Sequence, residues 1–537
     1  MHKQNNPSMQ HISSLIRRIS GIVIVTFCCV SAQAQWAYVG PPGFSLGLGS
    51  YQSMVVGSDG TPYVAYNDQS FPPSGKAVVM KFDDTNWVAV GMPGFTVDMA
   101  EQGCLAIDTN DSLYFSFQDQ SNSGRVSVMK FNGSSWTYVG QPGFSNGSAT
   151  CTSLRADTNN VLYCAYVDGS SGRAVVKTFN GVSWVAVGPS AEVSGSGANY
   201  TSLQIDPVTN APWVVFTDAM ASNNATVMKY DGISWVTVGA SGFSNSPSGV
   251  LQTDIALDAA GTAYVGYWDP FNALKAAVRK FNGTSWDTVG TPFISQGQVY
   301  FTSLVVDASG IPYISYMDYT VSGNAATTMR YDPSTTSWVS LGAPGYSGSN
   351  PGYLESAIDG NNSIYVTSLD GSNGNKVSVM KYAFCAQPVI SSNGAVLTST
   401  SASAYQWYVN QSLIPGANGQ SHTATQSGWY FVTATDTNGC SATSDSVFIL
   451  ISGTEEPAAG LVKLYPTLFS GTLQLSLHFP GVHDWQLCIA DMTGRAVYNH
   501  SGLQHNMILD LHSLAPGVYA VILSNGAERV VRKVMKQ

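Results

Sequence analysis

The sequence predicts an all-β protein whose main body is a seven-bladed β-propeller, and two observations lead to this prediction. First, a phrase of the form W-x-x-V/L-G recurs at intervals of 48 to 52 residues, and a nearly constant period of this length indicates repeated supersecondary units. Second, every unit contains four segments with the composition of short strands, which is typical of a propeller blade. The phrase begins at Trp36, Trp87, Trp136, Trp184, Trp235, Trp286 and Trp338.

The four segments of a unit follow one another in a fixed order. The first is apolar and ends in Asp, as in 303–307, and the second is aromatic and also ends in Asp, as in 313–318. The third is represented by 126–131, and the fourth is the tryptophan phrase. Alternating side chains, β-branched and aromatic residues, and Asn-Gly or Asp-Gly turns between the segments favour antiparallel strands.

The two ends of the repeat region are complementary. The region begins with a tryptophan strand at 36–40 and ends with a third strand at 377–382, so the seventh unit lacks its fourth strand. Pairing these two segments closes the ring and removes two exposed sheet edges. The alternative is an open β-solenoid, which leaves both partial units unpaired. We therefore expect a closed propeller over residues 35–383.

Composition limits the classes of partner. The 537 residues are too many for one hydrophobic core, so several domains are expected. Charged residues make up only 10% of the chain, and the net charge is −10 without a run of basic residues. This balance argues against nucleic acid and anionic membranes as partners, and nothing in the sequence indicates a cofactor.

Residues 1–34 have the pattern of a secretory signal peptide. Basic residues, including Arg17 and Arg18, precede a short apolar stretch at 21–30. The small residues Ala32 and Ala34 then mark a cleavage site. Because the apolar stretch is too short to span a bilayer comfortably and no other segment is apolar enough, we expect an exported protein without a transmembrane segment.

Candidate binding residues lie at positions where one repeat unit differs from the others. The long loops, from fourth to first strands and from second to third strands, are expected on one face, and such loops commonly carry binding residues. Three alternate positions on each first strand are expected to face the central channel. At some of these positions aromatic, amide or charged residues form a candidate ligand site: Tyr51, Arg155, Tyr200, Gln204, Asp254, Tyr353 and Glu355.

Two other interpretations of the channel remain open. A water-filled channel tolerates polar substitutions without any ligand, because charged groups there need only solvent or a partner. Catalysis is the second interpretation. Residues 36–383 contain no histidine, which excludes a histidine-based triad or a histidine-ligated metal in the propeller. Asp254 and Glu355 then remain as a candidate pair of catalytic carboxylates.

An Asp follows the second strand of every unit, and we interpret it as a turn residue rather than a calcium ligand. Lys or Arg begins the next strand in five units, so ion pairs that close these hairpins explain the aspartates. The spacing of acidic residues in a calcium-binding loop is absent, and we predict no metal site. The residues are Asp68, Asp119, Asp168, Asp218, Asp269, Asp318 and Asp370.

A different pattern covers residues 384–452. The phrase Y-x-W at 405–407 is followed at 428–442 by G-x-Y-x-V-x-A-x-D-x-N-G-C-S-A. Together these phrases resemble the Ig-like modules of Bacteroidota surface proteins, which implies a small β-sandwich acting as a spacer. Cys385 and Cys440 bracket the module and are a candidate disulfide pair. Residues 453–460 have the composition of a linker.

The region 461–537 carries a second resemblance. Its strand-like phrases and basic tail occur in a fixed order at 464–466, 473–477, 489–497, 514–519 and 532–536. This order is similar to that of the C-terminal sorting domain of type IX secretion substrates, although the usual Pro-Asn-Pro is here Pro466-Thr467-Leu468. The resemblance implies a small β-sandwich, recognition by the type IX machinery, and release or attachment at the outer surface.

Taken together, these interpretations favour a secreted or surface-displayed binding or adhesion protein whose propeller face holds a glycan or a protein. The alternative is a secreted carbohydrate-active enzyme, a hydrolase or lyase, that uses Asp254 and Glu355. A structural component of the surface layer is the third possibility. Convergence of the candidate residues on one pocket favours the first two interpretations over the third.

Overall fold

The computed structural model describes residues 36–72, 75–384, 387–435, 441–449, 451, 462–478, 482–491, 494–525 and 529–537. The expected signal peptide and the expected linker lie outside the described residues. Cys385 and Cys440 also lie outside them, so their pairing stays a prediction. The described strands are accompanied only by short 3-10 helices.

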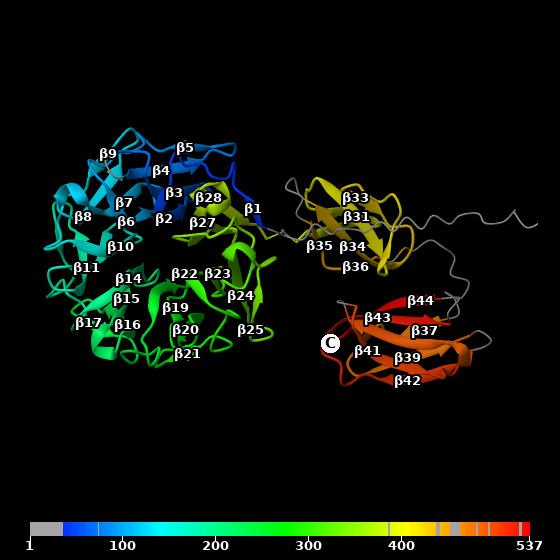
Figure 1. Cartoon of the computed structure of the whole chain (residues 1–537). Coiled ribbons are helices and arrows are strands. Elements are labelled where there is room, and N and C mark those ends of the chain that lie inside the picture. Colours follow the sequence, from blue (N-terminus) through cyan, green and yellow to red (C-terminus); the bar gives the residue numbers. More distant parts are fainter. Residues whose placement is uncertain are drawn as a thin grey trace, which may run out of the picture.

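Seven four-stranded antiparallel sheets, counted over the described residues, form the blades of a propeller (Figure 1). The first strands of neighbouring blades contact one another around the axis. They are β2 (Gly49–Val56), β6 (Ala100–Ile107), β10 (Ala149–Ala156), β14 (Ala198–Ile205), β18 (Leu251–Leu257), β22 (Val299–Val306) and β26 (Glu355–Ile358).

The other strands of each blade follow outward in chain order. The second strands are β3 (Pro62–Asp68), β7 (Leu113–Asp119), β11 (Leu162–Asp168), β15 (Pro212–Asp218), β19 (Ala263–Asp269), β23 (Pro312–Asp318) and β27 (Ile364–Asp370). The third strands are β4 (Lys76–Phe82), β8 (Arg125–Phe131), β12 (Arg173–Phe179), β16 (Asn224–Tyr230), β20 (Lys275–Phe281), β24 (Ala326–Asp332) and β28 (Lys376–Tyr382). The fourth strands are β5 (Trp87–Ala89), β9 (Trp136–Tyr138), β13 (Trp184–Ala186), β17 (Trp235–Thr237), β21 (Trp286–Thr288) and β25 (Ser337–Ser340), completed by β1 (Trp36–Tyr38).

The seventh blade is completed by the first strand of the chain. Its order is β1-β28-β27-β26, and Trp36 pairs with Tyr382 in an antiparallel register. The predicted closure of the ring is therefore confirmed, and the alternative of an open solenoid is wrong. No strand of the described propeller is left over at either end of the repeat.

The repeated tryptophans join each blade to the one before it. The indole Nε1 of Trp87 donates to the carbonyl oxygen of Val39 over 2.7 Å, and the same bond recurs at every blade junction. The other pairs are Trp136–Val90, Trp184–Val139, Trp235–Val187, Trp286–Val238, Trp338–Val289 and Trp36–Leu341, at 2.7–2.9 Å. This ring of bonds explains why the tryptophan of the phrase recurs.

The glycine of the phrase makes room for the next tryptophan. Gly91 has a φ of 77°, and a Cβ there would lie 3.3 Å from Cδ1 of Trp136. A side chain at this position is therefore both strained and obstructed.

An aromatic residue of the preceding blade stacks on five of the seven tryptophans. The ring of Phe44 lies 4.3 Å from that of Trp87, at an interplanar angle of 14°. Val193 and Ile294 take the place of the aromatic residue in two blades, and the facing Trp235 and Trp338 are partly exposed there. The aromatic partner thus completes the burial of the indole.

Two further β domains follow the propeller. The first has one sheet of β29 (Ile390–Asn393), β30 (Val396–Ser399) and β33 (Ser421–Thr423), and another of β32 (Ser412–Leu413), β31 (Ala404–Val409), β34 (Gly428–Thr435), β35 (Ser441–Thr443) and β36 (Val447–Ile449). Trp407 and Tyr430 are the largest side chains of its core. A two-sheet architecture agrees with the expected sandwich, while its Ig-like relationship stays a prediction.

The last domain also has two sheets. One contains β37 (Val462–Tyr465), β39 (Thr472–Leu477) and β42 (Asn506–Asp510). The other contains β38 (Leu468–Phe469), β44 (Arg529–Lys536), β43 (Gly517–Ser524), β40 (Gln486–Asp491) and β41 (Ala496–Ser501). Buried Leu, Ile and Val side chains from both sheets surround Trp485. No helix in the described part of the chain is long and apolar enough to cross a bilayer.

Candidate functional site

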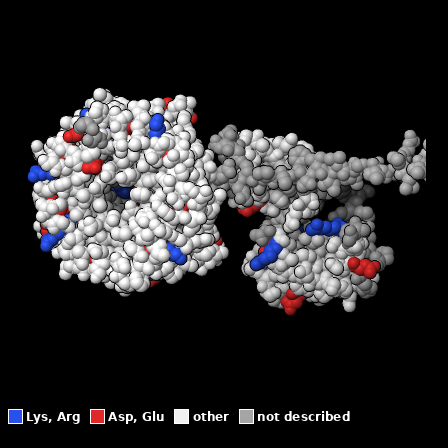
Figure 2. Space-filling view, viewed as in Figure 1, with Lys and Arg blue, Asp and Glu red and all other residues white. Residues whose placement is uncertain are grey.

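A cavity of about 680 Å³ lies at the centre of the propeller, walled by the first strands of the blades. Figure 2 shows the hollow on one face of the molecule, with basic surface inside it. All seven predicted site residues line this one cavity: Tyr51, Arg155, Tyr200, Gln204, Asp254, Tyr353 and Glu355. The structure therefore brings together residues that span more than half of the chain.

The mouth of the cavity is a ring of residues in the left-handed conformation. Each of the seven blades contributes one, with φ between 48° and 54°: Tyr51, Gln102, Cys151, Tyr200, Gln252, Phe301 and Tyr353. None of them is Gly or Asn, so each carries a cost of about 1–2 kcal/mol in backbone strain. Such strain, repeated around one opening, is typical of functional sites.

A β-bulge in the first strand produces this conformation. In the third blade Thr150 pairs with Val167 and Ser153 pairs with Ala165, so two residues of β10 oppose one residue of β11. The same register shift occurs in the first six blades. The prediction that strict alternation places the site residues on one strand face is therefore wrong at the mouth. The bulge, not the alternation, directs these residues into the cavity.

The mouth is asymmetric, with an aromatic arc over three adjacent blades. The ring of Tyr353 lies 4.9 Å from that of Tyr51 and 5.6 Å from that of Phe301. Burial raises the pKa of Tyr51 to about 12, and Tyr353 and Glu101 add to the effect. All three rings are only partly buried, so their surfaces are accessible from the cavity.

Amide groups on the rest of the rim support the neighbouring blade. The side-chain oxygen of Gln252 accepts a hydrogen bond from the backbone N–H of Phe301 over 2.9 Å, and Gln102 accepts one from the N–H of Cys151. Their oxygens thus have a structural role, which sequence reasoning did not identify.

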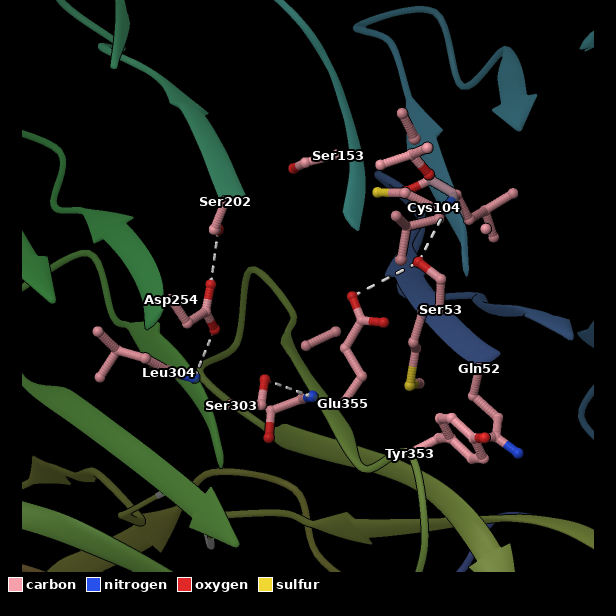
Figure 3. A pocket seen from close by; sticks show the side chains of 18 of the residues that line it. Gln52, Ser53, Cys104, Ser153, Ser202, Asp254, Ser303, Leu304, Tyr353 and Glu355 are labelled. Carbon is pink, nitrogen blue, oxygen red and sulfur yellow. Dashed lines mark hydrogen bonds between the residues drawn. The ribbon is translucent and has the colours of Figure 1, made fainter. Parts of the chain in front are cut away.

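The next tier of side chains holds the blades together. Ser53 accepts a hydrogen bond from the N–H of Leu105 in the next blade over 2.9 Å, and equivalent residues do the same around the channel. Asp254 occupies this position in the fifth blade, and its Oδ2 accepts from the N–H of Leu304 over 2.9 Å (Figure 3). The other such acceptors are Cys104, Ser153, Ser202 and Ser303.

Glu355 takes the same position in the seventh blade. Its Oε1 lies 3.5 Å from the Oγ of Ser53, which donates to it. Burial raises the pKa of Glu355 to about 7, although Arg155 acts in the opposite direction. Burial also raises the pKa of Asp254, against the hydrogen bonds that stabilise its carboxylate. Both carboxylates therefore favour the protonated form more than a solvent-exposed acid does.

Arg155 lies one tier deeper. Its Nη1 donates to the carbonyl oxygen of Leu154 over 2.8 Å, and its Nε lies 3.4 Å from Oε1 of Gln204. Burial alone would lower its pKa, but Cys104 and the two carboxylates raise it above its ordinary value. Among the described residues, Arg155 forms no ion pair with Asp254 or Glu355. The guanidinium of Arg155 and the two carboxyl groups thus line the cavity without direct contact.

The seven aspartates after the second strands are turn residues, as predicted. Oδ1 of Asp68 accepts from the N–H of Ser70 over 2.9 Å and from the N–H of Gly47 over 3.0 Å. Because Gly47 lies in the loop before β2 and Ser70 in the loop after β3, these bonds place both kinds of long loop on one face.

The predicted ion pairs at these hairpins are wrong. No carboxylate of this set pairs with the Lys or Arg that begins the next strand in the described residues, and Arg173 instead pairs with Glu192 over 2.6 Å. The aspartate oxygens are occupied by N–H and hydroxyl groups of the loops. In the described part of the chain, no three His, Cys, Asp or Glu residues gather as a metal site.

Sequence reasoning missed Gln52, which also lines the cavity. Its side chain is 5% exposed, and neither its amide oxygen nor its amide nitrogen has a hydrogen-bond partner. Four other blades have threonine here, as at Thr201, whose hydroxyl donates to the carbonyl oxygen of Cys151 in the preceding blade. Comparison of the repeats at this position is the signal that would have identified Gln52.

Comparison with protein families accounts for the last domain. Residues 463–537 match the family of the secretion system C-terminal sorting domain. The sorting domain directs the chain into type IX secretion, so the protein is exported, to the surroundings of the cell or its outer surface. Comparison with curated proteins finds no match.

Several solved structures are similar to the propeller. One is a protein of unknown function from Dyadobacter fermentans, at 12% identity over 65% of this chain and 97% of that chain, with a TM-score of 0.39. Another is the six-bladed propeller lectin of Aleuria aurantia, at 16% identity over 58% and 100%, with a TM-score of 0.38. A third is a polysaccharide lyase, an ulvan lyase, at 10% identity over 63% and 94%, with a TM-score of 0.42. At these identities the similarity concerns the fold alone.

Proposed function

We propose that the protein is a secreted, non-catalytic binding or adhesion protein that holds a glycan, or a surface protein, in the central cavity of the propeller. The observation that carries this proposal is the strained ring at the mouth. A bulge repeated around the channel presents side chains toward one opening, and the aromatic residues among them gather on one arc.

The chemistry of the cavity suits a saccharide. The accessible faces of Tyr51 and Tyr353 offer surfaces on which the apolar face of a sugar ring can stack. Arg155 and Gln204 on the walls below offer hydrogen-bonding groups to the hydroxyl groups of a sugar. A volume of about 680 Å³ lies within the usual range of ligand pockets.

The roles of the carboxylates favour binding over catalysis. Asp254 accepts hydrogen bonds through both oxygens, from Ser202 and from the backbone of Leu304, at 2.8 and 2.9 Å. Serine fills the same position in four other blades and accepts the corresponding bond. The carboxylate of Asp254 thus has a structural task that needs no reaction.

The proposal is tested by screening the full chain against a glycan array and in a pull-down from the cell surface. Replacing Tyr51 and Tyr353 together by alanine should weaken binding roughly tenfold or more, since each aromatic contact contributes about 0.5–1.5 kcal/mol. Ile233→Ala is the matched control, because Ile233 is 80% exposed in an outer turn. If the array and the pull-down find no ligand and the protein degrades a polysaccharide, the proposal is contradicted.

One observation favours a second candidate function, a carbohydrate-active enzyme. The pKa of Glu355 is raised to about 7 by burial, which suits a general acid at neutral pH, and Asp254 lines the same cavity. The double variant D254A/E355A tests this version against any polysaccharide that the protein degrades. Unchanged turnover in that variant rules out these two carboxylates as the catalytic pair.

A further inference from the structure

Arg155 carries a charge that the protein does not neutralise by direct contact. It is the only Lys or Arg among the described residues that line the cavity. Its Nη1 bonds to the carbonyl oxygen of Leu154 and lies 3.4 Å from the sulfur of Cys104, while Nη2 makes no hydrogen bond within the described residues. An arginine with a free Nη2 in a cavity is suited to an acidic group, which a guanidinium binds through charge-assisted hydrogen bonds.

The acidic residues of the cavity leave that charge available. Asp254 is engaged by Ser202 and Leu304, and Glu355 lies against Ser53, as the dashed lines in Figure 3 show. Neither forms an ion pair with Arg155 in the described part of the chain. The raised pKa of both carboxyl groups reduces the negative charge that an acidic ligand would meet.

The separation between Arg155 and the aromatic arc at the mouth indicates an elongated ligand. Arg155 stands four residues further along β10 than Cys151 at the mouth, which corresponds to roughly 10 Å when the bulge is allowed for. A ligand that reaches Arg155 while contacting the aromatic arc is therefore longer than a single sugar.

We propose that the ligand of the cavity is an oligosaccharide that carries a carboxylate, with the acid group on Arg155 and a ring on the aromatic arc. This inference rests on the proposed function and specifies its substrate class. No covalent step is involved. The neutral and sulfated saccharides are the competing classes.

The test compares oligosaccharides of galacturonate, glucuronate and mannuronate with their methyl esters, which keep the stereochemistry and lose the charge. Sulfated and neutral oligosaccharides complete the panel. Binding to the full chain is measured by calorimetry at two ionic strengths. We expect at least one uronate to bind, its methyl ester to bind at least tenfold more weakly, and the difference to shrink at high salt.

Two variants of Arg155 refine the test. Arg155→Ala introduces the residue found at Ala106, Ala256 and Ala357, so the fold has precedent for it. It should bind the uronate and its ester equally, whereas Arg155→Lys should keep part of the preference. Melting curves establish that each variant is folded.

The outcomes separate this inference from the proposed function. If a neutral or sulfated saccharide is preferred, or if acid and ester bind alike in the parent protein, the inference is overturned and glycan binding stands. If Arg155→Ala keeps the full preference for the acid, the assignment to Arg155 is overturned. If no saccharide of the panel or array binds, the inference and the proposed glycan function fail together.

Discussion

The indole nitrogen of Trp36 donates to the carbonyl oxygen of Leu341 over 2.7 Å, although 305 positions separate the two residues in the chain. The ring of Trp36 also lies 3.7 Å from that of Tyr346, in a stacked arrangement. Leu341 is 5% exposed, so its carbonyl oxygen has little access to water if the indole is removed. This contact joins the sixth blade to the strand that completes the seventh.

We expect Trp36→Phe to lower the free energy of unfolding by about 1–3 kcal/mol, because it leaves a buried carbonyl group without its donor. Trp338→Phe is the comparison, since Trp338 donates the same kind of bond, to the carbonyl oxygen of Val289, but lacks a stacked aromatic partner and is partly exposed. Trp338→Phe should lower the free energy of unfolding by less than Trp36→Phe does. Urea denaturation followed by fluorescence measures both, and equal costs would contradict the role given to burial.

The pairing of β1 with β28 can be tested by Ala37→Pro. Ala37 faces Lys381 in the register, and its side chain is exposed, so proline interrupts the strand pairing without removing a core contact. Hydrogen exchange should show loss of protection in β28 and retained protection in β15. Ala37→Ser is the control and should behave as the parent protein does. Uniform exchange in both variants would indicate that closure does not depend on this strand.

Tyr200→Gly should affect stability and ligand binding in different ways. Tyr200 has a φ of 52°, where glycine is free of the strain of about 1–2 kcal/mol that other residues carry. The glycine variant should therefore be more stable than Tyr200→Ala by about 1 kcal/mol, the reverse of the order in a regular strand. Both variants should bind the ligand more weakly than the parent. A glycine variant less stable than the alanine variant would argue against strain at the mouth.

Glu355 should make stability depend on pH. Burial raises its pKa from the ordinary 4.5 to about 7, so between these values the folded state holds a proton that the unfolded state releases. The resulting stabilisation is fully present below pH 4.5 and is lost as pH rises through 7. Its size is on the order of 3 kcal/mol.

Glu355→Gln removes this titration while keeping a neutral hydrogen-bonding side chain. Above pH 8 the variant should be more stable than the parent, and the gap should close as the pH falls toward 4.5. Denaturation curves across this range provide the measurement. A gap that stays constant with pH would show that Glu355 does not titrate differently in the folded state.

Deleting residues 463–537 should stop export. In a host with type IX secretion, the intact protein is expected outside the cell or on its surface, and the truncated protein should remain within the cell envelope. Fusing the same segment to a reporter is the complementary experiment. Appearance of the truncated protein outside the cell at the level of the parent would mean that another segment directs secretion.

The number of blades and the closure of the ring could be predicted from the sequence, because both can be determined from the copies of the repeat. The tryptophan phrase marks one junction per blade, and the single strand at 36–40 and the three-stranded unit that ends at 377–382 add up to one blade. The seven candidate residues, all of which line the cavity, were also chosen from the repeat, as places where one blade differs from the others. These predictions needed only comparison of one unit with the next.

The bulges and the hydrogen-bond ring around the channel were not predictable in the same way. A left-handed residue is usually indicated by Gly or Asn, whereas Tyr, Gln, Cys and Phe occupy those positions here. The acceptor position is filled by residues as different as Ser53, Cys104 and Asp254, which share only the ability to accept a hydrogen bond. A side chain whose role is shared by unlike residue types leaves no pattern in the repeat.

The ion pairs expected at the hairpins were wrong for a related reason. Asp68 and Lys76 do face each other in the register of β3 and β4. The carboxylate of Asp68 is fully buried, however, and backbone N–H groups from two loops occupy it. Sequence spacing identified the neighbours, but only the folded structure shows which of several available donors is used.

The closing contact between β1 and β28 imposes an order on biosynthesis. The strand at Trp36–Tyr38 is made first and its partner at Lys376–Tyr382 last among the strands of the propeller. Until translation reaches that partner, both ends of the growing array present unsatisfied backbone groups that strands of other chains can occupy. A chain whose translation stops early is therefore prone to associate with other chains. Completion of the last blade pairs both of these strand edges within one chain.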